Sequence, residues 1–156
     1  MRRFLLATLL AVSASAQARD VQLALVEQRA SEQTDYLLNL ETLSVRKIPS
    51  AQGAELPQTQ KYLSQNRKLV VGADRVADAD EVLYQCAIDD TDLVIVRDEY
   101  NSANPLYWLA AASGHPVQVS RIVALTVKNG HVVSEREITR KASSYDWVAR
   151  VYSAEP

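Results

Sequence analysis

Apolar and polar side chains alternate near the start of the globular part of the chain, where Val21, Leu23 and Leu25 stand two residues apart. A period of two places all three side chains on one face of an extended backbone. The alternation therefore predicts a half-buried strand over residues 20–28.

Two apolar-rich runs follow at residues 35–40 and 43–48, separated by two polar residues. This spacing predicts a β-hairpin. The apolar positions between residues 36 and 47 also fit one stripe of a helix. Strands are favoured because Val45 and Ile48 continue a β-type pattern.

Proline and glycine divide the next part of the chain. Residues 49–57 are polar, contain two prolines and predict a loop. A proline at the first helical position favours a short helix over residues 58–67. The apolar residues 69–71 predict a short buried strand ended by Gly72, and residues 73–81 form an acidic stretch.

Residues 82–88 and 92–99 predict two further strands. Residues 93–96 are all apolar, so their side chains occupy both faces, which is typical of a central strand. At the end of the chain, residues 145–152 fit a short helix capped by Ser144 slightly better than a strand.

The clearest helix signal covers residues 104–113. Asn104 suits the N-cap, where its side chain accepts hydrogen bonds from free amides, and Pro105 suits the first helical position. Gly114 suits a left-handed residue after the last turn, and Pro116 blocks continuation. Together these residues predict a helix of two to three turns.

The clearest hairpin covers residues 117–141 around Asn129 and Gly130, two residues that tolerate the positive φ of a type I′ turn. A regular two-residue turn would pair Val123 with Arg136 further along. The second strand is rich in charge, which is typical of a sheet edge.

Together these elements predict an α+β fold, a mainly antiparallel β-sheet with two or three short helices packed on it. Strands do not alternate regularly with long helices, so a doubly wound parallel sheet is disfavoured. Residues 19–156 are long enough for a single globular domain of ordinary size.

The first eighteen residues have the layout of a secretory signal peptide. Arg2 and Arg3 precede an apolar run over residues 4–12, and small residues follow up to Ala18. Cleavage near Ala18, or after Ala16, predicts a periplasmic or secreted protein. No other apolar run approaches the roughly 20 residues that a membrane-spanning helix needs.

The net charge and the cysteine content of the chain exclude some classes of partner and some kinds of site. Without residues 1–18 the chain keeps 15 of its 17 basic residues and all 19 acidic ones, a formal charge of −4. This balance excludes a strongly basic nucleic-acid-binding protein. The single cysteine, Cys86, excludes an internal disulfide and a cysteine-based zinc site. It shares an apolar face with Val82, Tyr84 and Ile88, so we expect a buried, inert thiol, and pairing between chains is the alternative.

Signals for catalysis are weak. The sequence has no glycine-rich phosphate-binding loop and no nucleophile elbow. Its two histidines, His115 and His131, lack ligand spacing, and His131 follows a hairpin turn where it should be solvated. The acidic residues 74–81 and 89–92 lack the calcium-loop pattern and predict solvated turns. No metal or cofactor is expected.

The densest mixture of polar and aromatic residues lies between residues 98 and 115, a combination that suits a sugar, a peptide or another small polar ligand. Alternatively, Tyr107 and Trp108 only anchor the predicted helix on the sheet. The predicted ligand-binding residues are Asp98, Tyr100, Asn101, Tyr107, Trp108 and His115.

Two functions fit these observations. The first is an exported, non-enzymatic module that binds a protein or a small ligand, and it rests on size, location and the missing catalytic motifs. The alternative is a small hydrolase or isomerase that uses His115 as a general base with a carboxylate, either Asp98 or Glu99.

Overall fold

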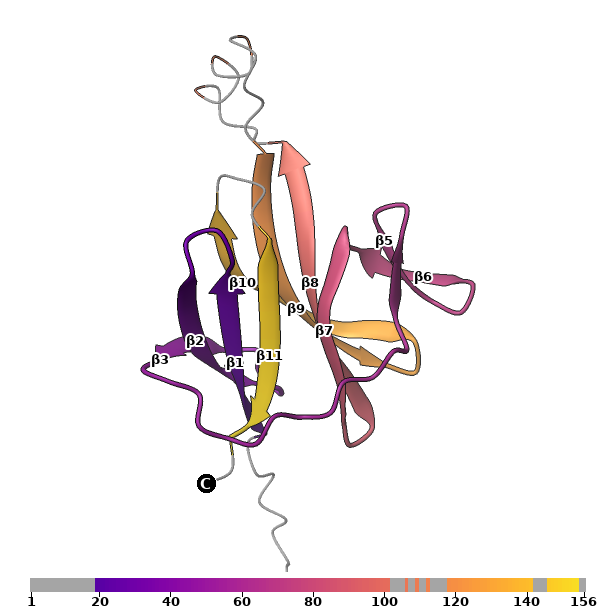
Figure 1. The fold of residues 1–156 in the computed structure, drawn as a ribbon. Helices are drawn as coiled ribbons and strands as arrows, with labels where there is room; N and C mark the ends of the chain where they lie inside the picture. The colour runs from indigo at the N-terminus through magenta and orange to yellow at the C-terminus, as the bar shows by residue number, and fades with distance from the viewer. Residues whose placement is uncertain are drawn as a thin grey trace, which may run out of the picture.

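The computed structural model describes residues 19–101, 106, 109, 112, 118–141 and 146–154, and this part of the chain is built from antiparallel strands (Figure 1). The strands are β1 (Asp20–Glu27), β2 (Glu32–Asn39), β3 (Val45–Ile48), β4 (Leu63–Gln65), β5 (Lys68–Val71), β6 (Asp74–Asp78), β7 (Glu81–Ile88), β8 (Thr91–Asn101), β9 (Gln118–Lys128), β10 (His131–Lys141) and β11 (Trp147–Ser153).

The strands form three sheets. One four-stranded sheet has the order β11-β1-β2-β3, a second has the order β10-β9-β8-β7, and a small third sheet has the order β4-β5-β6. Figure 1 shows the first sheet, the second sheet and the small sheet following one another across the molecule as three layers. We call the second sheet the central sheet.

Apolar side chains bury both faces of the central sheet. Leu93 and Ile95 of β8 pack in one cluster with residues of β1, β2 and β11. Val94 and Val96 of the same strand pack in another cluster, with Leu69 of the small sheet. The alternation of side chains along a strand explains the split. The prediction of a central strand with two apolar faces is confirmed.

Several sequence predictions are confirmed by the pairing. β1 lies over the predicted residues 20–28, and β2 with β3 forms the predicted hairpin. The Asn129-Gly130 turn has positive φ at both residues, 52° and 76°, and joins β9 to β10. β10 lies at a sheet edge, as its charge predicted.

The predicted α+β class is wrong, because the described chain is strand and loop apart from Leu106, Leu109 and Ala112, which are helical and exposed. The rest of the predicted helix over 104–113 lies outside the described residues. Residues 145–152, described from 146, continue into β11 instead of forming a helix. The helical alternative over 36–47 is also wrong.

The predicted helix over 58–67 is an extended segment that continues into β4. Gln85 of β7 explains this, because its backbone carbonyl accepts a 2.8 Å hydrogen bond from the Thr59 N–H. Its side-chain Oε1 also accepts hydrogen bonds from the N–H groups of Lys61 and Tyr62, at 2.9 and 2.8 Å. The N–H groups of Lys61 and Tyr62 are donors that a helix would have used, and here they are satisfied by Gln85. The Tyr62 side chain is buried.

The strand pairing of the described residues shifts register at four places, and two of these β-bulges change a face that the sequence predicted. In β10 the pairing shifts between Val132 and Ser134, so Arg136 lies opposite Ala124 and not opposite Val123 as predicted. In β7 the pairing shifts between Val82 and Tyr84. A bulge adds one residue to a strand and reverses the alternation beyond it.

The β7 bulge separates residues that the sequence placed on one face. Tyr84 and Cys86 pack toward β1 and β2, whereas Val82 packs toward the small sheet. The predicted burial of the lone thiol is nevertheless confirmed, since Cys86 is a fully buried free cysteine.

Candidate functional site

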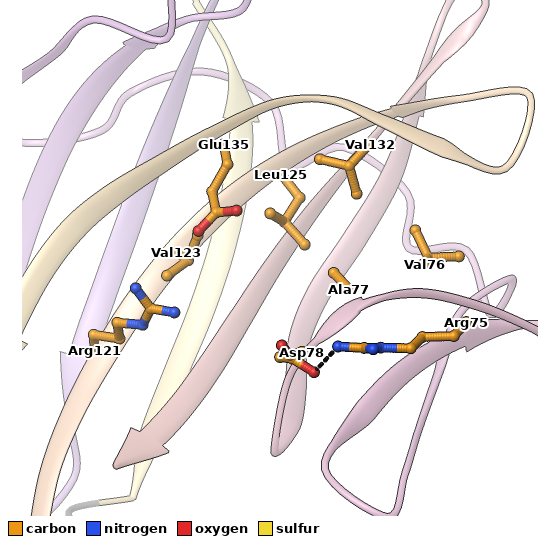
Figure 2. Close-up of a pocket in the computed structure, with 9 residues that line it drawn as sticks. All are labelled: Arg75, Val76, Ala77, Asp78, Arg121, Val123, Leu125, Val132 and Glu135. Atoms are coloured by element: carbon orange, nitrogen blue, oxygen red, sulfur yellow. Dashed lines mark hydrogen bonds and ion pairs between the residues drawn. The ribbon is translucent and has the colours of Figure 1, made fainter. Parts of the chain in front are cut away.

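A groove of about 390 Å³ lies between the small sheet and the outer part of the central sheet (Figure 2). We call it the β6 groove. One wall is β6, and the other side is formed by β9 and β10. Its lining residues are Arg75, Val76, Ala77, Asp78, Arg121, Val123, Leu125, Val132 and Glu135.

The β6 wall presents its edge to the groove. A β-bulge at Val76 breaks the alternation of this strand, so Val76 and Ala77 both pack toward the central sheet, whereas Arg75 and Asp78 are exposed. All four of these residues line the groove, so both faces of β6 contribute to it. β6 pairs with β5 on one side and is the last strand of the small sheet. The wall therefore includes main-chain groups as well as side chains.

The floor belongs to the outer face of the central sheet. β9 contributes the alternate residues Arg121, Val123 and Leu125, as expected of a strand seen from its face. Val123 and Leu125 are almost completely buried. The β10 bulge brings Val132 and Glu135 to the same side, since these two residues lie opposite Val127 and Leu125.

Charge surrounds this floor. Arg75 and Asp78 form an ion pair along the β6 wall (Figure 2). Arg121, at one end, donates a 2.7 Å hydrogen bond from Nε to Asp98 Oδ2, and its Nη2 lies 2.7 Å from the same oxygen as an ion pair. No hydrogen bond or ion pair connects the exposed Glu135 to any other residue the structure describes. Its carboxylate is therefore available to a ligand.

Beyond Arg121, the Tyr100 ring lies near two guanidinium groups. The Cζ atoms of Arg121 and Arg140 are 5.8 and 5.5 Å from its centroid, which is within cation–π range. Arg140 also donates hydrogen bonds of 3.0 and 2.7 Å to Glu137, and these bonds lower the pKa of that carboxyl group. This arrangement holds the end of the groove in place.

A second hollow of about 300 Å³ is lined by Tyr100 together with Arg67, Asp80, Glu99 and Gln118. Arg67 crosses it, forming a 2.8 Å ion pair with Asp80 and donating a hydrogen bond to the backbone carbonyl of Glu99. The Glu99 N–H in turn donates a 2.7 Å hydrogen bond to Asp80. This hollow is occupied by its own ion pairs, so we regard it as a structural connection between the small sheet and β8.

Two of the predicted ligand-binding residues, Asp98 and Tyr100, lie together at the Arg121 end of the β6 groove without lining it. Asn101 ends β8. Tyr107, Trp108 and His115 lie outside the described residues. The two carboxylates considered for catalysis already have partners: Asp98 binds Arg121, and Glu99 lies 3.3 Å from Arg97.

The residues that form the groove were not predicted from the sequence. β4, β5 and β6 are joined by two-residue turns, Asn66-Arg67 and Gly72-Ala73. Asn66 has φ of 48° and Gly72 has φ of 63°, both typical of tight hairpin turns. These turn residues were the sequence signal for a meander of three short strands. A helix over residues 58–67 and an acidic stretch over residues 73–81 were predicted instead.

Within the described ranges, no group of three or more histidine, cysteine, aspartate or glutamate side chains is arranged to hold a metal ion. No helix in that same part of the chain is long and apolar enough to cross a membrane. Comparison of the chain with protein-family models, with curated proteins and with solved structures found no match.

Proposed function

We propose that this chain is an exported, non-enzymatic binding protein that holds a protein segment or a small ligand in the β6 groove. The observation that carries the proposal is the groove itself, whose volume of about 390 Å³ lies in the range of roughly 300–1,000 Å³ typical of ligand sites. The exposed Glu135, which has no partner among the described residues, supplies a specific polar contact on its rim. The mixed signs of its charges give no preference for nucleic acid.

Export is supported by the layout of residues 1–18, a charged start, a short apolar run and small residues. Mass spectrometry of the protein isolated from outside the cytoplasm should show the loss of eighteen residues, or of sixteen if the earlier site is used. An intact Met1 on cytoplasmic protein would contradict export without affecting the groove.

Binding is tested by NMR titration of the purified protein with two separate pools, random short peptides and small polar organic molecules. We expect shifts at residues 75–78, Val132 and Glu135. The variant Glu135→Lys should lose the response. Glu41→Lys is the matched control, since Glu41 is also exposed and lies in the β2–β3 turn of the first sheet.

Shifts that map to the first sheet, or that persist unchanged in Glu135→Lys, would overturn the assignment of the groove. Responses to both pools at the same residues would show a general binding surface. A response to one pool alone identifies the class of ligand.

A further inference from the structure

We propose that the ligand of the β6 groove is an extended peptide segment of another protein, which adds as a strand to the edge of β6 that pairs with no other strand in the described part of the chain. This inference rests on the function proposed above and names its ligand class. Its starting point is the edge-on wall of the groove, which four consecutive residues of β6 line. A strand edge offers unpaired N–H and C=O groups, and these groups recognise another extended chain.

The direction of the main-chain groups supports this inference. The Ala79 N–H donates a 3.1 Å hydrogen bond to the Arg67 carbonyl, and Lys68 lies opposite Asp78 in the next pair. Main-chain groups point alternately toward and away from the neighbouring strand in an antiparallel ladder. The N–H and C=O of Asp78 therefore point away from β5, toward the open side of β6.

The burial of the floor argues for main-chain recognition. Val123 and Leu125 are only 2% and 1% exposed, so they leave little apolar area for a ligand to cover. Binding must then come mainly from hydrogen bonds and charge. A strand added beyond β6 would supply main-chain hydrogen bonds and would extend the small sheet over the half-buried Val132.

The charged residues around the groove determine which side chains we expect the bound peptide to carry. Arg75 and Asp78 neutralise each other on the β6 wall, whereas Glu135 faces the groove from β10 without a partner among the described residues. A lysine or arginine of the added strand would pair with that carboxylate. Four residues of β6 span about 13 Å at roughly 3.3 Å per residue, so the segment is short.

The first step of the test is a selection of linear heptapeptides from a random phage-displayed library on the immobilised protein. We expect enriched peptides with alternating apolar and polar residues and at least one lysine or arginine. Fluorescence anisotropy then measures their affinity. Glu135→Lys should weaken binding about tenfold or more, the loss of roughly one charged hydrogen bond, whereas Glu41→Lys should change it less than about twofold.

The second step separates strand addition from other peptide binding. N-methylation at alternate residues of the best peptide removes either the amides that face β6 or those that face away. We expect one alternate set to abolish binding and the other to leave it nearly unchanged. Binding that is insensitive to N-methylation, or equally sensitive at every residue, would overturn the inference. Failure to enrich any peptide, while small molecules still shift the groove residues, would also overturn it and leave the proposed function standing.

Discussion

The Tyr62 hydroxyl donates a 2.7 Å hydrogen bond to Oδ2 of Asp92, across thirty residues of sequence. Both residues are buried, and Lys61 Nζ lies 2.8 Å from the same carboxylate oxygen. This contact joins the extended segment before β4 to the start of β8. It therefore fixes the chain at the point where it enters the small sheet.

Tyr62→Phe should lower the free energy of unfolding by about 1–3 kcal/mol, because Asp92 loses a buried donor while the ring still fills its site. Lys61→Met should cost less, since that ammonium is half exposed and a largely hydrated ion pair contributes little. Urea unfolding of both variants would measure the difference. A Tyr62→Phe protein as stable as wild type would show that the hydrogen bond is not needed.

Stability should fall as pH rises above about 9. Burial raises the pKa of the Cys86 thiol to about 12, and burial also raises the pKa of Tyr84 to about 12. In the unfolded chain a thiol loses its proton near pH 8.5. Between that pH and 12 the unfolded state binds fewer protons than the folded state, so the free energy of unfolding decreases with pH.

Cys86→Ala isolates the contribution of the thiol. Between pH 8 and pH 10, the free energy of unfolding should decrease by roughly 1–2 kcal/mol more for wild type than for this variant. The reason is that only wild type has a thiol that ionises on unfolding. Denaturant titrations at these two pH values would measure the slopes. Parallel slopes would mean that the thiol ionises equally in both states, contrary to its burial.

Gly53 is required by a close approach. A Cβ at this position would lie 1.6 Å from the backbone carbonyl oxygen of Ser153, so Gly53→Ala should destabilise the protein by about 1–3 kcal/mol or more. Gly72→Ala is the comparison, because a Cβ there meets open space and only its φ of +63° opposes the change, at about 1 kcal/mol. Thermal melts should rank the first variant as the less stable. The reverse order would contradict the contact.

Deletion of Val133 should be tolerated. This residue is 57% exposed and occupies the β10 bulge, so its loss leaves Ser134 opposite Thr126 and keeps Glu135 on the groove side. We expect a change in stability below about 1 kcal/mol by thermal melting, as for other exposed positions. Deletion of Ala124, a buried residue of the regular strand β9, is the control and should unfold the protein.

The local patterns predicted strands well where alternation or apolar runs were strong. β1, β8 and the β9–β10 hairpin follow from residues such as Leu23, Ile95 and Gly130. The segment around Tyr62 was not predictable in this way, because Gln85, distant in sequence, determines its extended form. Tertiary hydrogen bonds override a local helix signal in such a segment.

Only the Arg121 end of the β6 groove could be predicted from the sequence. Asp98 and Tyr100 were identified from their chemistry, and they contact Arg121 at the edge of the groove. The walls depend on which strands lie side by side, and the position of Glu135 depends on a bulge. Neither a sheet-to-sheet contact nor an added residue in a ladder leaves a periodic signal in the sequence.

The order of the first sheet has a consequence for how the chain folds. β1 lies between β2 and β11, so it pairs with residues 32–39 and with residues 147–153. The partner on one side follows β1 directly in the sequence, whereas the partner on the other side lies more than a hundred residues further along the chain. Until β11 has paired, one edge of β1 is a template for pairing with another chain. We therefore expect this sheet to be completed late in folding, and the protein to be most prone to aggregation before β11 pairs with β1.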